Sequence, residues 1–366
     1  QAAGFVGIAG DGIRPLQINR QTDDGDIIEF RKDGSTVGAI AARSGDLAIG
    51  TGNCGVIFND GTEIIIPANI TTNAVSDAAV DLGYSAGRFK DLHLSGTAFL
   101  SLIETATSGT SNFRAGVNAG NSIASGGNYN TVVGDEAGTA ISTGDNNTFL
   151  GYQSGDAVNT GGDNVAIGFS ALSAEDAHGL NVAVGSQALR VQNAGANAYN
   201  VGVGYNAGGA ITTGIQNTLV GGLAGDAINT AAANVAMGYE ALSTDTKGEQ
   251  SVAIGYRALK TQNQSTSANA YNTAVGSQAG LSITAGIKNV LVGGLAGDAI
   301  EDADENIAIG YDSLGTNTVG SASVAVGASA LRTQNPDTAT NMYNTAVGHF
   351  AGYGITTGVR NNLFGG

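Results

Sequence analysis

Tryptophan is absent from this sequence of 366 residues, which has only three prolines and one cysteine. Cys54 alone cannot form an intrachain disulfide or a thiolate metal cluster, so other forces must hold the fold together. The sequence contains no apolar run long enough for a transmembrane helix, and we expect no membrane insertion. Residues 1–20 lack a basic start followed by an apolar stretch, so we expect no signal peptide there.

Charged residues are also scarce, at 13% of the chain, and their balance is acidic, with a net charge of −16. Nucleic acid is excluded as a partner, because binding to phosphates requires clustered Lys and Arg. The acidic charge keeps a long particle soluble. Small side chains and 58 glycines indicate closely spaced backbones rather than a thick globular core.

The dominant feature is an internal repeat that begins near residue 130. Its pattern is Asn, two or three apolar residues, Gly, two variable residues, and then Ala or Ser, as in Asn164–Gly168 followed by Ala171. The marker glycines recur at one constant interval, and a longer interval follows every fourth unit. We predict that they form the corners of stacked coils: Gly134, Gly151, Gly168, Gly185, Gly204, Gly221, Gly238, Gly255, Gly276, Gly293, Gly310, Gly327 and Gly348, with Gly365 as a fourteenth.

Four coils make a larger block, and the blocks start near Asn130, Asn200, Asn272 and Asn344. The longer intervals predict loops that bulge from every fourth coil, such as Leu189–Asn200 and Leu259–Asn272. A period of about 17 residues is too short for a helical hairpin repeat. The sequence therefore predicts a parallel β-solenoid of about fourteen coils.

Alternate positions of each short strand lie on opposite faces. The residue before each marker glycine is always large and apolar, and we expect this face to fill the interior. The residue before that one is often Ala or Gly, and we expect this face to pack against other chains in a homotrimer. Stacking of like residues about 4.8 Å apart should turn the repeated Asn into a hydrogen-bonded ladder.

The N-terminal segment over 1–67 shows a different pattern, with short alternating strands separated by turns. We expect strands at 26–32, 35–42, 46–50, 54–59 and 62–67, joined by Asp33-Gly34, Ser44-Gly45 and Asp60-Gly61. The predicted organisation is an N-terminal β domain over 1–67, a connector over 68–129 and a solenoid shaft over 130–366. The fold class is all-β.

Two stretches resemble known families. The Asn-Val-Ala-Ile-Gly coil is similar to the β-roll of trimeric adhesin heads, although the period there is shorter. Residues 24–50 and 81–96, above all Arg88–Gly96, resemble bacteriophage tail-fibre proteins, in which such a segment precedes a repetitive shaft. The resemblance implies a homotrimeric fibre on an extracellular virion, joined to other tail proteins and contacting a host glycan or protein. Such fibres often carry a C-terminal chaperone that cleaves itself off.

The chemical motifs in the sequence favour no catalytic, cofactor or metal site. Gly83–Gly87 matches a nucleophile elbow, but the long helix that should follow it is missing from the pattern. Gly202–Ala207 matches a dinucleotide fingerprint, but it is one copy of the coil. The three histidines do not share metal-ligand spacing. Acidic turns at 145–147, 161–163 and 302–305 offer oxygens to calcium, but solvated turns are the favoured explanation.

Five tyrosines that follow marker glycines are candidate surface contacts: Tyr152, Tyr205, Tyr239, Tyr256 and Tyr311. Exposed aromatic rings can stack on sugars, whereas rings packed on a neighbouring coil or chain would be structural. The sequence thus predicts a non-enzymatic tail-fibre shaft of a phage. The alternatives are a bacterial trimeric adhesin or surface filament and, with less support, a polysaccharide depolymerase, which would need paired carboxylates in a groove.

Overall fold

The computed structural model describes residue 18 and residues 23–52, 54–61, 64–69, 74–75 and 107–366. The chain divides into two compact units, Gln1–Phe99 and Leu100–Gly366. The described residues of both units form strands, turns and bends, and they contain no helix. The predicted all-β fold is therefore confirmed. The resemblance segment Arg88–Gly96 and the motif Gly83–Gly87 lie outside the described residues.

The first unit contains an antiparallel meander whose strands pair in sequence order. Its strands are β1 (Gly25–Lys32), β2 (Ser35–Arg43), β3 (Asp46–Thr51), β4 (Cys54–Asn59), β5 (Ile64–Asn69) and β6 (Ala74–Val75). The turns Asp33-Gly34 and Ser44-Gly45 have positive φ at both residues, as tight hairpins require. The strands expected over 26–32, 35–42, 46–50 and 54–59 and the first two hairpins are thus present, whereas the fifth strand spans Ile64–Asn69 and the connection before it includes residues outside the described ones.

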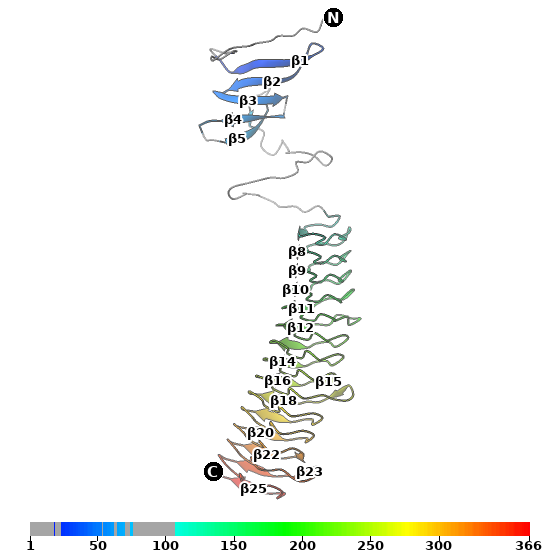
Figure 1. Cartoon of the computed structure of the whole chain (residues 1–366), viewed down its shortest axis with the longest axis vertical. Coiled ribbons are helices and arrows are strands. Elements are labelled where there is room, and N and C mark those ends of the chain that lie inside the picture. Colours follow the sequence, from blue (N-terminus) through cyan, green and yellow to red (C-terminus); the bar gives the residue numbers. More distant parts are fainter. Residues whose placement is uncertain (1–17, 19–22, 53, 62–63, 70–73, 76–106) are drawn as a thin grey trace, which may run out of the picture. The chain divides into compact units, whose positions relative to one another are not determined.

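The second unit is a solenoid whose coils each contribute one strand to a parallel sheet of fifteen strands. Figure 1 shows these strands stacked one above the other. The strands are β7 (Phe113–Ala115), β8 (Thr131–Val133), β9 (Thr148–Leu150), β10 (Val165–Ile167), β11 (Val182–Val184), β12 (Val201–Val203), β13 (Thr218–Val220), β14 (Val235–Met237), β16 (Val252–Ile254), β18 (Thr273–Val275), β19 (Val290–Val292), β20 (Ile307–Ile309), β22 (Val324–Val326), β24 (Thr345–Val347) and β25 (Asn362–Phe364).

The sheet begins one coil earlier than the repeat pattern indicated. β7 pairs in parallel with β8, with Phe113 opposite Thr131, so part of the predicted connector belongs to the solenoid. The chain around β7 departs from the repeat signature, because Arg114 takes the middle strand position. Backbone pairing continues there although the side-chain pattern does not.

The loops of two longer coils each add a short strand, which pairs with a short strand of the preceding coil, whereas the predicted loop Leu189–Asn200 forms no strand. β15 (Gly248–Glu249) pairs with β17 (Ala268–Asn269), and β21 (Gly320–Ser321) pairs with β23 (Thr340–Asn341). The strands β15 and β23 lie on the side of the coils away from the main sheet (Figure 1). The extra residues of these coils are therefore accommodated without interrupting the sheet.

The marker glycines form one column, and each directly follows a strand. All thirteen predicted corner positions have φ between +128° and +142°, a region that L side chains avoid. At Gly221 an added Cβ would lie 2.6 Å from the carbonyl oxygen of Gly238 in the next coil. Both the backbone conformation and the close stacking of coils therefore require glycine there.

The coils of one block fill their interior with two different combinations of residues. In two coils of each block, a glycine such as Gly208 leaves room for a buried isoleucine, Ile211, further along the same coil. In the other two coils, a buried leucine such as Leu242 takes the glycine's place, and a buried polar residue such as Asp245 takes the isoleucine's. Each small interior position is thereby matched by a larger one in the same coil.

Candidate functional site

The outward face of the fifteen-stranded sheet is an apolar surface that runs along the described solenoid. In β14 the middle residue, Ala236, is fully buried, whereas Met237, just before the marker glycine, is 43% exposed. The same pattern runs through β8 to β24, where the middle residue is always buried. The expected assignment of faces was wrong, because the small residues fill the interior and the large apolar residues face outward.

This inversion has a simple steric cause. So short a coil encloses little space, and part of that space is already taken by large side chains such as Leu172 and Ile211. Middle strand positions therefore admit Ala or Gly in most coils, and a larger residue such as Phe149 only where a neighbouring position is glycine. The large residues that flank the middle position must then point away from the coil.

The outward face carries no charge, although the chain has a net charge of −16. We define it as the first and third residues of each strand of the parallel sheet. From β8 to β24 these residues are all Thr, Val, Ile, Leu or Met. Several are well exposed, including Leu150 at 47% and Ile309 at 39%. A continuous uncharged strip of mostly β-branched residues is typical of a surface that packs against protein.

The antiparallel sheet of the first unit also has an apolar face without a described cover. Leu47, Phe58 and Ile65 lie opposite one another on β3, β4 and β5, so they share one face. They are 46%, 39% and 65% exposed. The other face holds small buried residues such as Ala41 and Ala48, which pair directly. Each unit, taken by itself, thus presents a large apolar surface.

The five candidate tyrosines are all at the surface, with exposed fractions from 44% for Tyr152 and Tyr256 to 60% for Tyr205 and Tyr311. Tyr239 and Tyr256 stack with ring centroids 6.0 Å apart, and Tyr152 stacks on Phe169 at 5.9 Å. Contacts with the neighbouring coil therefore account for part of their packing, and a broad ring area stays accessible.

A network of charges flanks the Tyr239–Tyr256 stack. The guanidinium of Arg257 lies 4.9 Å from the Tyr256 ring centroid, and Arg257 Nε donates to Glu240 Oε2 over 2.7 Å. Lys260 Nζ donates to the same oxygen over 2.6 Å. The hydrogen bond from Lys260, followed by that from Arg257, lowers the pKa of Glu240. These ion pairs are partly exposed and contribute little to stability, but they fix the position of the two stacked rings.

Three equivalent aspartates, Asp156, Asp226 and Asp298, recur in the second coil of successive blocks. Each has one carboxylate oxygen that is buried without a hydrogen-bond partner. Burial raises the pKa of all three carboxyl groups. Because the same arrangement recurs in every complete block, it belongs to the coil architecture rather than to a single site.

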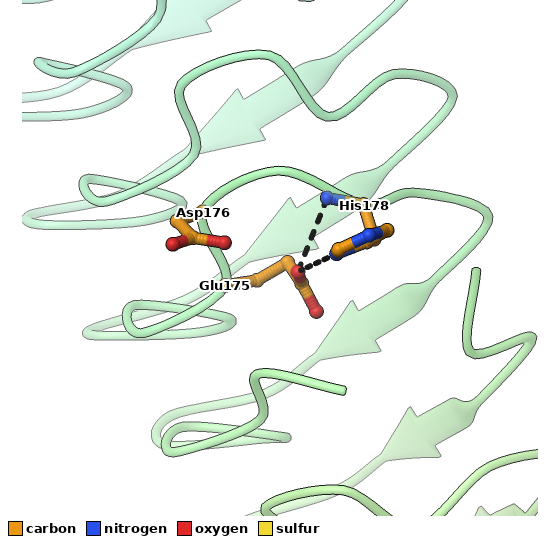
Figure 2. Close-up of side chains that lie close together, drawn as sticks. All are labelled: Glu175, Asp176 and His178. Atoms are coloured by element: carbon orange, nitrogen blue, oxygen red, sulfur yellow. Dashed lines mark hydrogen bonds and ion pairs between the residues drawn. The ribbon is translucent and has the colours of Figure 1, made fainter. Parts of the chain in front are cut away.

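A cluster of ligand-type side chains lies in the third coil of the first block, on the turn that follows β10. Figure 2 shows Glu175, Asp176 and His178, which each offer one ligand atom, with all three atoms within 4.8 Å of one another. The Glu175 side chain is fully buried, and the His178 side chain is 30% exposed. The sequence interpretation missed this group because it compared only the histidines with each other.

The acidic turns considered for calcium are occupied by contacts between coils. Asp145 Oδ1 accepts from the backbone nitrogen of Asn128, and Asp163 Oδ1 accepts from Asn146 Nδ2. In the third turn, Asp304 Oδ1 accepts from the backbone nitrogen of Ile287. These bonds give the carboxylates a structural role. The segment Gly202–Ala207, which matches the dinucleotide fingerprint, contains the end of β12 and the turn after it, as one coil among others.

Comparison with known proteins gives no match among protein-family models, curated protein sequences or solved structures. The described part of the chain contains no apolar helix of membrane-spanning length. Function is therefore argued from the surfaces and clusters described above.

Proposed function

We propose that this chain is a structural fibre protein and that its solenoid associates with two further copies through the outward face. The observation that carries this proposal is the uncharged strip of Thr, Val, Ile, Leu and Met along the parallel sheet. A monomer would leave this strip in water over the whole length of the sheet. Packing of like faces around a common axis removes it from water without bringing like charges together.

The energetics of the strip favour association. A half-exposed Val or Ile gains roughly 1 kcal/mol when the rest of its surface is buried, about half the value for a whole side chain. Each coil contributes two such positions, so the gain grows with the number of coils. The loss of translational and rotational freedom is incurred once per association and amounts to about 4–15 kcal/mol. A long solenoid is therefore expected to associate where a single coil would not.

The biological role follows from the resemblance of two segments, Arg88–Gly96 and the Asn-Val-Ala-Ile-Gly coil, to phage tail fibres and adhesin heads. In our proposal the trimer is a stiff shaft in the tail fibre of an extracellular virion. It joins other tail proteins and positions or provides contact with a glycan or protein on the host surface. The function is mechanical, and the exposed tyrosine corners, such as Tyr239 and Tyr256, are available for contact.

Native mass spectrometry and sedimentation of the whole chain test the assembly. We expect a mass three times that of the 36.3 kDa chain. A stable monomer at micromolar concentration would overturn the assembly, and a dimer would overturn its three-fold form. Imaging of purified virions and of bacterial cells with antibody against this chain tests the role. Label on tail fibres supports it, whereas label confined to bacterial surface filaments favours an adhesin.

A further inference from the structure

The turn at 175–178 departs from the repeat that surrounds it. At the two corresponding positions after the marker glycine, the equivalent third coils carry Asp245 with Gly248, and Asn317 with Gly320. The first block carries Glu175 with His178. At Gly248 an added Cβ would lie 2.3 Å from Asp245 Oδ2, so a side chain at this position meets the acidic group directly. Only the first of the three third coils therefore places an imidazole beside the buried acid.

The acid alone is explained by the turn. Glu175 Oε1 accepts from the backbone nitrogen of His178 over 3.2 Å, as Asp245 Oδ1 does from Gly248 over 2.8 Å. The turn does not require the imidazole of His178, because the two equivalent coils form the same turn with glycine at this position. His178 Nδ1 is buried and makes no hydrogen bond, and it lies 3.7 Å from Glu175 Oε1. That separation is too long for a hydrogen bond.

We propose that Glu175, Asp176 and His178 bind one divalent first-row transition-metal ion, of which Zn²⁺ is the test case. An imidazole nitrogen with two carboxylates is a donor set that such ions accept. Two ligand atoms on a tetrahedral Zn²⁺, each about 2.1 Å from the ion, are roughly 3.4 Å apart. The 3.7 Å separation of Nδ1 and Oε1 therefore closes with a shift of a few tenths of an ångström. Water completes the coordination.

The neighbouring coils hold the two acidic residues in place. Glu175 Oε2 accepts from Gln192 Nε2 of the next coil over 3.1 Å, which leaves Oε1 directed toward His178. The carbonyl oxygen of Asp176 accepts from the backbone nitrogens of Asn159 and Thr160 in the previous coil, over 2.6 and 3.2 Å. Such supporting bonds orient metal ligands and strengthen binding. Figure 2 shows the three side chains gathered on this one turn.

A bound ion cross-links the side chains of the turn at 175–178, which already contacts the coils on both sides. The ion neutralises the buried Glu175 carboxylate and gives a partner to the unpaired Nδ1. The site lies within one chain, so it does not depend on the proposed trimer.

Isothermal titration of the chelator-treated whole chain with ZnCl₂, and absorption spectroscopy with CoCl₂, test the site. We expect one ion per chain and a cobalt d–d band. His178→Gly restores the residue found in both sister coils, so it should keep the fold by circular dichroism and lose binding at least tenfold. His349→Gln, which removes an exposed histidine elsewhere, should leave binding unchanged.

The proposal is overturned if Zn²⁺ and Co²⁺ do not bind, if CaCl₂ binds and they do not, or if His178→Gly binds as tightly as the parent chain. Should His178→Gly fail to fold, Asp176→Ala replaces it, since Asp176 is exposed and its structural contacts are made by its backbone. Histidine ¹⁵N spectra add an independent readout, because Zn²⁺ should shift the His178 Nδ1 resonance and leave that of His349 in place.

Discussion

Oδ1 of Asn130 accepts two hydrogen bonds from Asn147 in the next coil, one from the backbone nitrogen over 2.9 Å and one from Nδ2 over 3.1 Å. Asn147 Nδ2 also donates to the carbonyl oxygen of Gly161, and Asn147 Oδ1 accepts from the backbone nitrogen of Asn164. Both Asn130 and Asn147 are fully buried. The asparagine column thus satisfies backbone groups that no strand pairing reaches.

Replacing one member of this column tests its contribution to stability. Asn147→Ala leaves the Gly161 carbonyl and the Asn164 nitrogen without their side-chain partners. A buried polar group without a partner costs about 1–3 kcal/mol, so we expect the unfolding free energy to fall by about 2–5 kcal/mol. Urea unfolding followed by circular dichroism measures this change, and a loss below about 1 kcal/mol would show that water replaces the side chain.

The chain offers a matched control at Ser251, which takes the place of asparagine in the same column. In the same coil as Ser251, Oε1 of Gln262 accepts a hydrogen bond from Nδ2 of Asn272 over 2.8 Å. In the first block Asn181 and Gln192 occupy the equivalent positions together, and both are buried. Ser251→Asn is therefore expected to keep or raise the urea midpoint, whereas a large drop would contradict the equivalence of the blocks.

Alanine substitution of two adjacent glycines distinguishes backbone strain at a residue with positive φ from the general effect of replacing glycine. Gly221 has φ of +134°, and its added Cβ would meet the Gly238 carbonyl, whereas a Cβ at Gly222 meets only the Tyr239 ring at 3.6 Å. We expect Gly221→Ala to lower the unfolding free energy by about 3 kcal/mol or more and Gly222→Ala to change it by less than about 1 kcal/mol. Thermal unfolding of both variants decides the matter, and equal losses would rule out a special role for the marker column.

The local features of the fold were predictable from the sequence, because each is determined by a few neighbouring residues. The marker glycines predict a backbone conformation that favours glycine, and the recurrent Asn predicts the hydrogen-bonded ladder that Asn130 and Asn147 form. Which face of each strand points into the coil was not predictable from neighbouring residues alone. It depends on how much of the interior is already filled by residues such as Leu172, which follow the strand in sequence.

The candidate metal cluster illustrates a second limit. Its residues lie close together in the sequence, yet nothing in Glu175–His178 alone reveals that the acid is buried and the imidazole nitrogen unpaired. Alignment of the blocks with each other would have exposed the signal, because His178 stands where Gly248 and Gly320 stand. A departure from an internal repeat is therefore as informative as the repeat itself.

The three half-buried aspartates predict an unusual dependence of stability on pH. Desolvation raises the pKa of Asp226 in the folded chain, so folding favours the protonated carboxyl group. Its contribution to stability is largest below the unfolded pKa, near 4, and is lost as the pH rises through the higher folded pKa. The parent chain should therefore lose more stability between pH 4 and pH 7 than a variant without these carboxylates.

The triple substitution Asp156→Asn, Asp226→Asn and Asp298→Asn tests this sign. The loss of stability from pH 4 to pH 7, measured by urea unfolding, should be smaller in the variant than in the parent. Asp163→Asn removes the same kind of charge from an exposed turn and serves as the control. An unchanged pH profile in the triple variant would show that these carboxyl groups remain solvated.

The outward face predicts which single substitutions break the assembly. Ile309 is the third residue of β20 and is 39% exposed in the single chain. Ile309→Asp places one carboxylate per chain in the proposed interface, and such a charge is costly to bury without a partner. Because the side chain is outside the coil, the fold of each chain should survive.

Sedimentation over a range of concentrations measures the effect. We expect the Ile309→Asp trimer to dissociate at a concentration at least about a hundredfold higher than the parent, a change of about 5.5 kcal/mol per trimer, because the dissociation constant of a trimer varies with the square of that concentration. Thr143→Asp adds the same charge at an exposed turn away from the sheet and should leave association unchanged. Equal dissociation of the two variants would mean that net charge, and not the outward face, controls association, because only Ile309 belongs to that face.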